Sequence, residues 1–187
     1  MPRAGLSRSA VVDIAIELLD EGTRAITLAA VAARAGVATP SLYKHVASLA
    51  ELRSLVALRV ITELTDRVAN AVIGRFGDDA IRALMRTYRS YAVDHAGRYS
   101  AIPPQPIGDA RLEPVANRLL DIILAVLRGY GMDGSTAIHA TRSLRSAAHG
   151  FVVLEAAGGF GLPEDLDTSY DHLTAMVIAG IHRLAEA

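Results

Sequence analysis

The sequence predicts an all-α protein. Apolar residues make up 51% of the 187 positions, and alanine and leucine are prominent among them. They recur at helical spacing, whereas β-branched residues rarely alternate with polar ones as they would in a strand. Glycine and proline fall between the periodic segments, where they end helices and form turns. A chain of this length can bury a core in one large domain, or in a small domain joined to a larger one.

The first expected helix spans residues 9–21 and has one apolar face. The residues of that face are Val11, Ile14, Ala15, Leu18 and Leu19. They follow the three- and four-residue spacing that brings side chains onto one side of a helix. Gly22 comes directly after this segment and can adopt the left-handed conformation that ends a helix.

Two short helices joined by a glycine-containing turn come next. Thr27 can cap the second helix, and Gly36 can end it. The third helix is expected to begin at Thr39-Pro40, a capping residue followed by proline in the first helical position, and to end near Val46. Two short helices at such a turn have helix-turn-helix geometry, although compact three-helix corners without a binding role share it.

A long fourth helix opens with a capping box, in which Ser48 is followed three residues later by Glu51. Its apolar pattern continues to about Ile73, before Gly74. A helix of that length would be roughly 39 Å long at 1.5 Å per residue. It is therefore long enough to link two modules.

The remaining chain predicts four further helices and one loop. The helices are expected at 78–97, 110–130, 135–157 and 169–185, with a proline-rich loop at 98–109. The predicted organisation is a three-helix domain at 1–50 with its helix-turn-helix motif at 27–46, a connecting helix at 51–74, and a helical-bundle domain at 75–187.

The composition excludes several kinds of chemistry. The chain has no cysteine, which excludes disulfides, thiolate metal sites and cysteine nucleophiles. It contains neither of the glycine-rich phosphate-binding motifs. Ser146 and His149 could be imagined as nucleophile and base, but no strand-borne elbow accompanies them. We expect no enzymatic activity, no catalytic residue, no cofactor and no metal site.

The hydropathy and the charge of the chain bear on its location in the cell and on how it could contact nucleic acid. No apolar run reaches the roughly 18 residues of a membrane span, and the acidic N-terminal segment does not resemble a signal peptide. We therefore expect a soluble cytoplasmic protein with no membrane partner. The net charge of −1 means that any contact with nucleic acid must come from a local patch.

The segment GVATPSLYKHV supplies such a patch. If Leu42 and Val46 point inward, the outward residues are Pro40, Ser41, Tyr43, Lys44 and His45. Lys44 is the only lysine in the chain, and no acidic residue lies in the segment. Lysine supplies charge to a phosphate-lined groove, and tyrosine and histidine supply hydrogen bonds. The N–H groups at the start of the second helix, next to Thr27, and at the start of the fourth can also hold anions.

The first 65 or so residues resemble the DNA-binding domain of the tetracycline-repressor (TetR) family. The resemblance covers the first helix, TLAAVAARAGV, GVATPSLYKHV and the Leu-x-x-Leu register of the fourth helix. It implies an all-helical homodimer with a helix-turn-helix in each subunit. It also implies a C-terminal domain that dimerises and usually holds a small ligand.

The resemblance assigns roles to individual residues. It implies that Tyr43 contacts phosphate, with Lys44 and His45 beside it, and that Thr39, Pro40 and Ser41 lie where base edges are usually contacted. Two positions depart from the family pattern. Val46 stands where many members have an aromatic residue, and Leu49 stands where many have a lysine that contacts phosphate.

The C-terminal half carries weaker signals. The stretch from Ser146 to Phe151, followed by Leu154-Glu155, resembles the His-Gly stretch of one TetR C-terminal subgroup. Six residues are candidates for an effector pocket: Met85, Tyr88, Tyr91, His95, Tyr99 and His149. A single tyrosine is more often part of a core, with its hydroxyl hydrogen-bonded, and the polar stripe that contains His149 could lie at a dimer interface.

Two functions remain from the sequence. The first is a ligand-responsive transcriptional repressor that binds a palindromic DNA operator as a homodimer. The last two long helices would form the interface between the two subunits. The effector is an unknown small molecule. The alternative is a helical small-molecule carrier or enzyme that kept the fold without DNA binding. The outward face at 39–45 distinguishes the two functions. It is basic and has no acidic residue, and a carrier would not need such a face.

Overall fold

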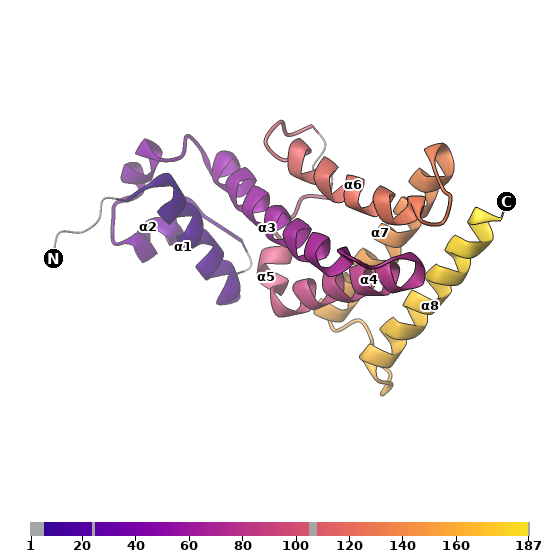
Figure 1. The fold of residues 1–187 in the computed structure, drawn as a ribbon. Coiled ribbons are helices and arrows are strands. Elements are labelled where there is room, and N and C mark those ends of the chain that lie inside the picture. Colours follow the sequence, from indigo (N-terminus) through magenta and orange to yellow (C-terminus); the bar gives the residue numbers. More distant parts are fainter. Residues whose placement is uncertain (1–5, 24, 105–107, 187) are drawn as a thin grey trace. The chain divides into compact units, whose positions relative to one another are not determined.

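The computed structural model describes residues 6–23, 25–104 and 108–186, and these contain helices and no strand (Figure 1). The predicted all-α fold is confirmed. The elements are α1 (Arg8–Asp20), α2 (Leu28–Ala35), the 3₁₀ helix η1 (Thr39–Lys44), α3 (Leu49–Val72), α4 (Gly77–Asp94), α5 (Ala96–Tyr99), α6 (Glu113–Arg128), α7 (Gly134–Ala156) and α8 (Leu166–Ala185).

The chain forms two compact units. The first, the N-terminal unit, combines the residues up to Thr62 with the segment His95–Val115, and the second, the C-terminal unit, combines Glu63–Asp94 with the residues from Ala116 onward. Helix α3 therefore contributes its first half to one unit and its second half to the other. The domain boundaries expected from the sequence, 1–50, 51–74 and 75–187, stay a prediction.

Several helix ends differ from those expected. The expected helix at 78–97 is divided into α4 and α5, and the expected loop at 98–109 begins inside α5; its residues 105–107 lie outside the described residues. Helix α8 begins three residues before the expected start at Ser169. The reason is Asp165, whose carboxylate accepts a hydrogen bond from the N–H of Thr168 at 2.7 Å and so caps an earlier first turn.

The third helix is shorter and tighter than expected. It is a 3₁₀ helix that ends at Lys44 rather than near Val46. The N–H of His45 donates to the carbonyl of Leu42 at 2.8 Å, a three-residue bond typical of this helix type. The tighter turn lets Val46, which is 1% exposed, join the core directly after the helix.

The N-terminal unit is built around the apolar faces of α1, α2 and η1. Its buried residues include Val11, Ala15, Leu19, Val31, Ala32, Leu42 and Val46. The expected caps are present: Thr27 Oγ1 accepts from the N–H of Ala30 at 3.1 Å, and Gly36 adopts the left-handed conformation with φ 67°. The inward orientation predicted for Leu42 and Val46 is confirmed.

The segment that includes α5 also packs in this unit. Arg98 makes two hydrogen bonds of 2.7 and 2.6 Å to the carboxylate of Asp20 at the end of α1, and these bonds lower the pKa of Asp20. Ala57 and Ile61 of α3 pack against Leu112 and Val115 in a small apolar cluster. The first half of α3 and the end of α1 are thus both held by residues of 95–115.

Helices α1 and α5 approach each other closely at Gly97. A Cβ atom at this position would overlap the backbone carbonyl of Leu19. Gly97→Ala is therefore expected to lower the free energy of unfolding by about 1–3 kcal/mol, because either α1 or α5 must shift. Chemical denaturation of the full chain measures this effect.

Gly161→Ala is the matched control for this prediction. A Cβ atom there meets nothing within 4 Å, and the backbone does not have a positive φ. We expect a change within about 0.5 kcal/mol. Equal stability of the Gly97→Ala variant and the parent chain would contradict the close packing of α5 on α1.

The C-terminal unit is held together by α4, α7 and α8, which pack against one another. Their buried residues include Ile81, Met85, Leu144, Phe151 and Ile178. The hydroxyl of Tyr170 donates to the carbonyl of Met85 at 2.9 Å and so joins α8 to α4. Within the described part of the chain, no helix is long and apolar enough to cross a membrane.

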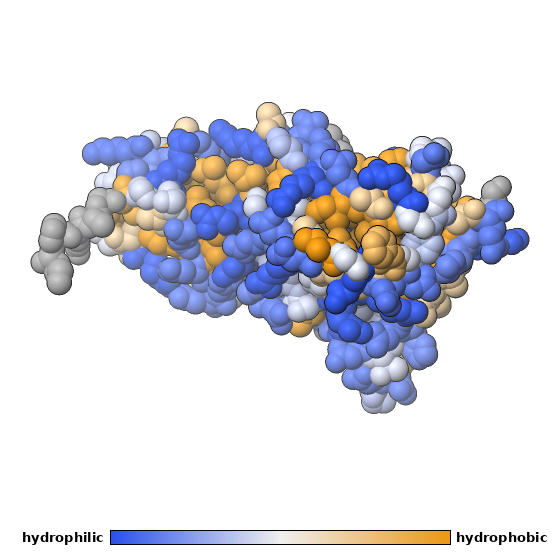
Figure 2. Space-filling view, in the orientation of Figure 1, coloured by the Kyte–Doolittle hydropathy of each residue, from blue (hydrophilic) through white to orange (hydrophobic). Residues whose placement is uncertain are grey.

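An apolar patch remains on the surface of this unit. Ile73 is 72% exposed and Phe76 is 83% exposed, both in the turn that follows α3. Together with Val72, Ile122 and Val126 they line a cavity of about 350 Å³. Figure 2 shows apolar side chains gathered in the region of α6 and the end of α3.

Candidate nucleic-acid interface

Helix η1 presents the predicted contact residues on its surface. Pro40, Tyr43 and Lys44 are exposed, with Tyr43 at 56%, whereas Thr39, Ser41 and His45 are half-buried. This orientation follows from Leu42, which is 0% exposed and anchors the opposite side of the helix. The surface combines one ammonium, hydroxyls and an imidazole without a carboxylate, and such a set can hydrogen-bond phosphate oxygens.

The start of α2 adds a second possible anion contact. Thr27 is exposed and caps the helix, and the first-turn N–H groups of a helix attract anions. Arg34 at the other end of α2 does not add to the positive surface. Its guanidinium is paired with the carboxylate of Glu21 and lies 3.9 Å from that of Glu17. Lys44 therefore carries the basic character of this helix pair.

The junction between η1 and α3 is fixed by a charged network centred on Glu51. The carboxylate of Glu51 accepts a hydrogen bond from the N–H of Ala47 at 2.5 Å, and the N–H of Glu51 donates to Ser48 Oγ at 3.0 Å. Two guanidinium groups approach the same carboxylate, Arg8 at 3.8 Å and Arg111 at 3.4 Å. The Glu51 side chain is only 12% exposed.

Arg8 also holds the residue that follows η1 directly. Its Nε donates to the carbonyl of His45 at 3.0 Å, which joins the first turn of α1 to the residue after η1. The capping box was visible in the sequence through the spacing of Ser48 and Glu51. The roles of Arg8 and Arg111 were missed, because they lie 43 and 60 positions from Glu51 and no local signal connects them.

The structure places the six candidate effector residues in both units. Met85 and Tyr91 are buried in the C-terminal unit, and the hydroxyl of Tyr91 donates to Glu63 Oε2 at 3.1 Å. Tyr88 is half-buried on the same helix. His95 and Tyr99 belong to the N-terminal unit, so the six residues do not lie within one unit.

The sixth candidate, His149, is exposed on α7. Partial burial of the imidazole, and then the charge of Arg145, lower its pKa. Across residues 6–23, 25–104 and 108–186, no group of three or more histidine and carboxylate side chains could hold a metal ion.

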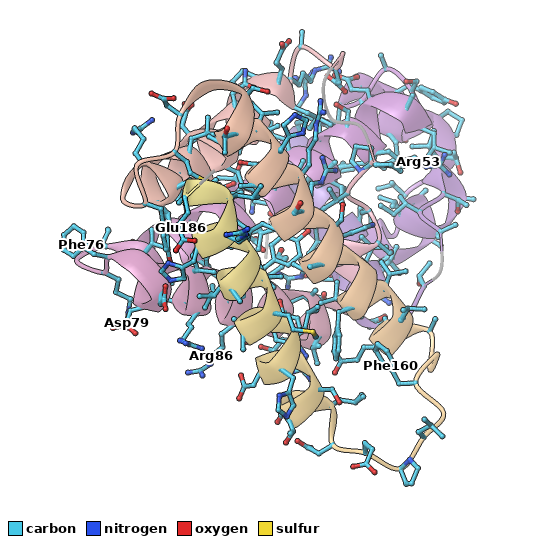
Figure 3. The ribbon with its side chains drawn as sticks, turned by 90° about the vertical axis from the view of Figure 1, so that its right-hand side faces the viewer. Arg53, Phe76, Asp79, Arg86, Phe160 and Glu186 are labelled. Atoms are coloured by element: carbon cyan, nitrogen blue, oxygen red, sulfur yellow. The ribbon has the colours of Figure 1, made fainter. Side chains whose placement is uncertain are left out.

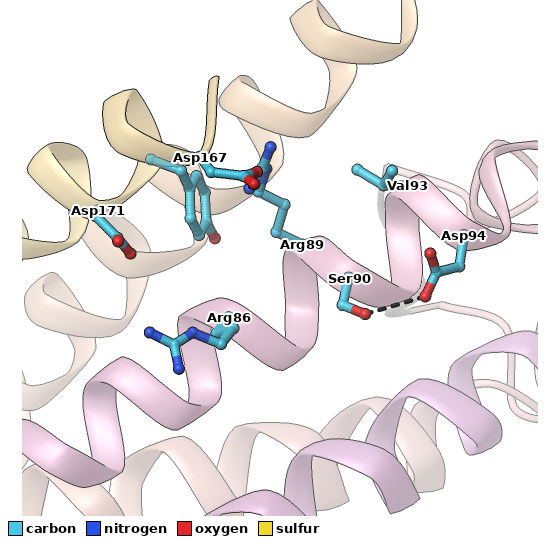
Figure 4. A pocket seen from close by; sticks show the side chains of 8 residues that line it. Arg86, Arg89, Ser90, Val93, Asp94, Asp167 and Asp171 are labelled. Atoms are coloured by element: carbon cyan, nitrogen blue, oxygen red, sulfur yellow. Dashed lines mark hydrogen bonds and ion pairs between the residues drawn. The ribbon is translucent and has the colours of Figure 1, made fainter. Parts of the chain in front are cut away.

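A cavity that sequence reasoning missed lies between α4 and the start of α8. It has a volume of about 390 Å³, and Figure 4 shows its lining: Arg86, Arg89, Ser90, Val93, Asp94, Asp167, Tyr170 and Asp171. Arg89 is engaged by Glu155 and Asp167, each at 2.7 Å. The lining residues come from segments 73 or more positions apart, which periodicity alone does not bring together.

These features define a class of protein: an all-helical protein with a helix-turn-helix in its N-terminal unit. Residues 81–177 match the family described as "Tetracyclin repressor-like, C-terminal domain". The HTH-type transcriptional regulator Rv0681 of Mycobacterium tuberculosis is 38% identical over 96% of this chain and 84% of its own length. YobS, an HTH-type transcriptional regulator of Bacillus subtilis, is 37% identical over 96% of this chain and 95% of its own.

A solved structure gives the same fold. A TetR variant from Acinetobacter baumannii in complex with minocycline matches 98% of this chain and 100% of its own, with a TM-score of 0.74 and 20% identity. The chain belongs to the TetR family of DNA-binding transcriptional regulators. The expectation that it is not an enzyme agrees with these relatives, which are regulators. The predicted His-Gly subgroup stays a prediction.

Proposed function

We propose that this chain is a ligand-responsive repressor that binds a palindromic operator as a homodimer. The observation that carries the proposal is the acid-free surface of η1. Tyr43 and Lys44 are exposed there. The buried side chain of Leu42 and the hydrogen bond from Arg8 to the carbonyl of His45 hold η1 against the core of the N-terminal unit. In a dimer, two such segments would enter successive major grooves, about 34–36 Å apart on one side of the duplex. The partner is chromosomal DNA, which places the regulator in the cytoplasm.

The outward faces of α7 and α8 support a dimer. Val153 and Leu154 on α7 are 45% and 50% exposed, and Met176 on α8 is 65% exposed. Ala179 and Gly180 are small and exposed on the same stretch of α8. Small residues let helices approach closely, and two helices from each subunit would bury these side chains in a symmetric four-helix interface.

The C-terminal unit is the proposed location of the effector site. The TetR structure with minocycline is that of a relative with a small molecule bound, and this chain shares its fold. An effector that binds one conformation more tightly shifts the population toward it. Helix α3 runs from one unit into the other without interruption, so it is the element through which we propose that the shift reaches η1.

Fluorescence anisotropy with duplex DNA from upstream of its own coding region tests the proposal. We expect sequence-preferring binding at moderate salt, with two chains per palindromic site. The oligomeric state is measured in parallel by light scattering. A folded dimer without any sequence preference would instead favour the carrier or enzyme that kept this fold.

Lys44→Ala is expected to weaken binding to all duplex sequences about equally. Loss of one phosphate contact should lower the slope of log K against log salt by about one unit, because one fewer counterion is released. Lys44→Arg keeps the charge and serves as the control, with the slope unchanged. An unchanged slope in Lys44→Ala would remove this side chain from the phosphate contacts.

A further inference from the structure

A groove with an unusual charge lies between the second half of α3 and the first half of α4. Its volume is about 500 Å³, within the range typical of small-molecule sites. The polar lining consists of Asn70, Arg75, Asp79, Arg82, Arg86 and Thr87. Three guanidinium groups therefore face one carboxylate. Figure 3 shows Asp79 and Arg86 pointing outward from the same helix, α4.

The arginines of this groove lack the partners that other arginines of the unit have. Arg89 is paired with Glu155 and Asp167 at 2.7 Å, and Arg118 is paired with Asp66 at 2.7 Å. Among the described residues, Arg82 and Arg86 form no ion pair within the groove or outside it. The charge of Arg82 acts on Asp78 only at longer range.

The third guanidinium of the groove, that of Arg75, has a neutral hydrogen-bond acceptor rather than a carboxylate as its partner. Arg75 donates to the backbone carbonyl of Ala71 at 2.9 Å, a neutral acceptor that fixes the side chain without neutralising it. The carboxylate of Asp79 forms no ion pair with a described residue either. Like charges in one groove repel one another, and a bound anion would relieve that repulsion.

We propose that this groove is a binding site for a small ligand with a phosphate or pyrophosphate group. The planar fork of guanidinium matches two oxygens of such a group at once, and two or three forks can surround it. The amide of Asn70 and the hydroxyl of Thr87 add neutral hydrogen-bonding groups to the lining. The site lies in the C-terminal unit and does not depend on DNA binding by η1.

The charges around the groove favour a small anion over a nucleic acid. Arg86 also lines the adjoining cavity, where the carboxylates of Asp94, Asp167 and Asp171 lie. Asp79 lies inside the groove itself. A polyanion that followed α4 would meet these carboxylates, whereas a compact anion would stay among the three arginines.

Titration of the full chain with inorganic pyrophosphate by isothermal calorimetry at low salt tests the site. We expect saturable binding with one pyrophosphate per chain. In the double variant Arg82→Gln with Arg86→Gln, the affinity should fall at least tenfold, because each charge-assisted hydrogen bond contributes that much or more. Asp79→Asn should bind more tightly than the parent, since it removes the carboxylate of the groove.

Arg183→Gln is the matched control, because this arginine is 84% exposed and paired only with the exposed Glu186. It changes the net charge of the chain without touching the groove, so its affinity should equal that of the parent. The absence of saturable binding, or an equal loss in Arg183→Gln, would overturn the site. Loss of binding to arbitrary duplex DNA in the double variant, with no pyrophosphate binding in the parent, would assign the groove to nucleic acid instead.

Discussion

Replacing Arg89 with methionine is expected to lower the free energy of unfolding by about 3 kcal/mol. The guanidinium joins three helices, because it extends from α4 to Glu155 on α7 and Asp167 on α8. It also lies over two aromatic rings, 5.5 Å from the centroid of Phe151 and 5.1 Å from that of Tyr170. The substitution removes these contacts and leaves the Glu155 carboxylate, only 14% exposed, without its partner. Removal of one member of a buried pair costs about 3–5 kcal/mol, and the partial exposure here places the effect at the lower end.

Urea unfolding followed by circular dichroism measures this loss. Arg118→Met is the control, because its ion pair with Asp66 is about half exposed on both sides. Such surface pairs contribute about 0–1 kcal/mol. Equal stability of the two variants would show that Arg89 does not hold α4, α7 and α8 together.

The second large effect is expected at Glu51, in operator binding. Glu51→Ala should weaken specific binding by about tenfold or more, because the N–H of Ala47 loses its acceptor and Arg8 and Arg111 lose their shared carboxylate. The backbone between η1 and α3 would then be less well fixed. Binding to arbitrary DNA should change little, and the salt slope of specific binding should stay the same, since no phosphate contact is lost.

Glu51→Gln separates the two roles of this side chain. The amide oxygen can still accept from Ala47, but the charge that attracts the two arginines is gone. We expect an affinity between those of Glu51→Ala and the parent. A reduced salt slope in either variant, as expected for Lys44→Ala, would mean that Glu51 acts on phosphate contacts rather than on the position of η1.

The parts of this fold that could be predicted are those that short-range chemistry determines. Thr27, Gly36, Ser48 and Glu51 cap helices through bonds to residues one to four positions away, and a sequence shows such spacing directly. The exposed face of η1 could be predicted in the same way, because Leu42 and Val46 are the apolar residues of the short segment 39–46. Its 3₁₀ form was not visible, since the same spacing suits one turn of an α-helix.

Contacts between distant residues could not be predicted. Arg98 reaches Asp20 across 78 positions, and Arg89 reaches Glu155 across 66. In a sequence each of these arginines is only a polar residue on a helix. The division between α4 and α5 was missed for a related reason: no glycine or proline marks residues 94–95, and the break accompanies the backbone approach of Gly97 to Leu19.

The 3₁₀ form of η1 changes how its surface is organised. With three residues per turn, side chains three positions apart are aligned. The buried Leu42 shares a column with the half-buried Thr39, while Pro40 with Tyr43 and Ser41 with Lys44 form two outer columns. The members of a column are about 6 Å apart along the axis, close to the rise of two base steps. A substitution in one outer column would thus leave the other in place, so that the DNA preferences of such a segment could diverge one column at a time.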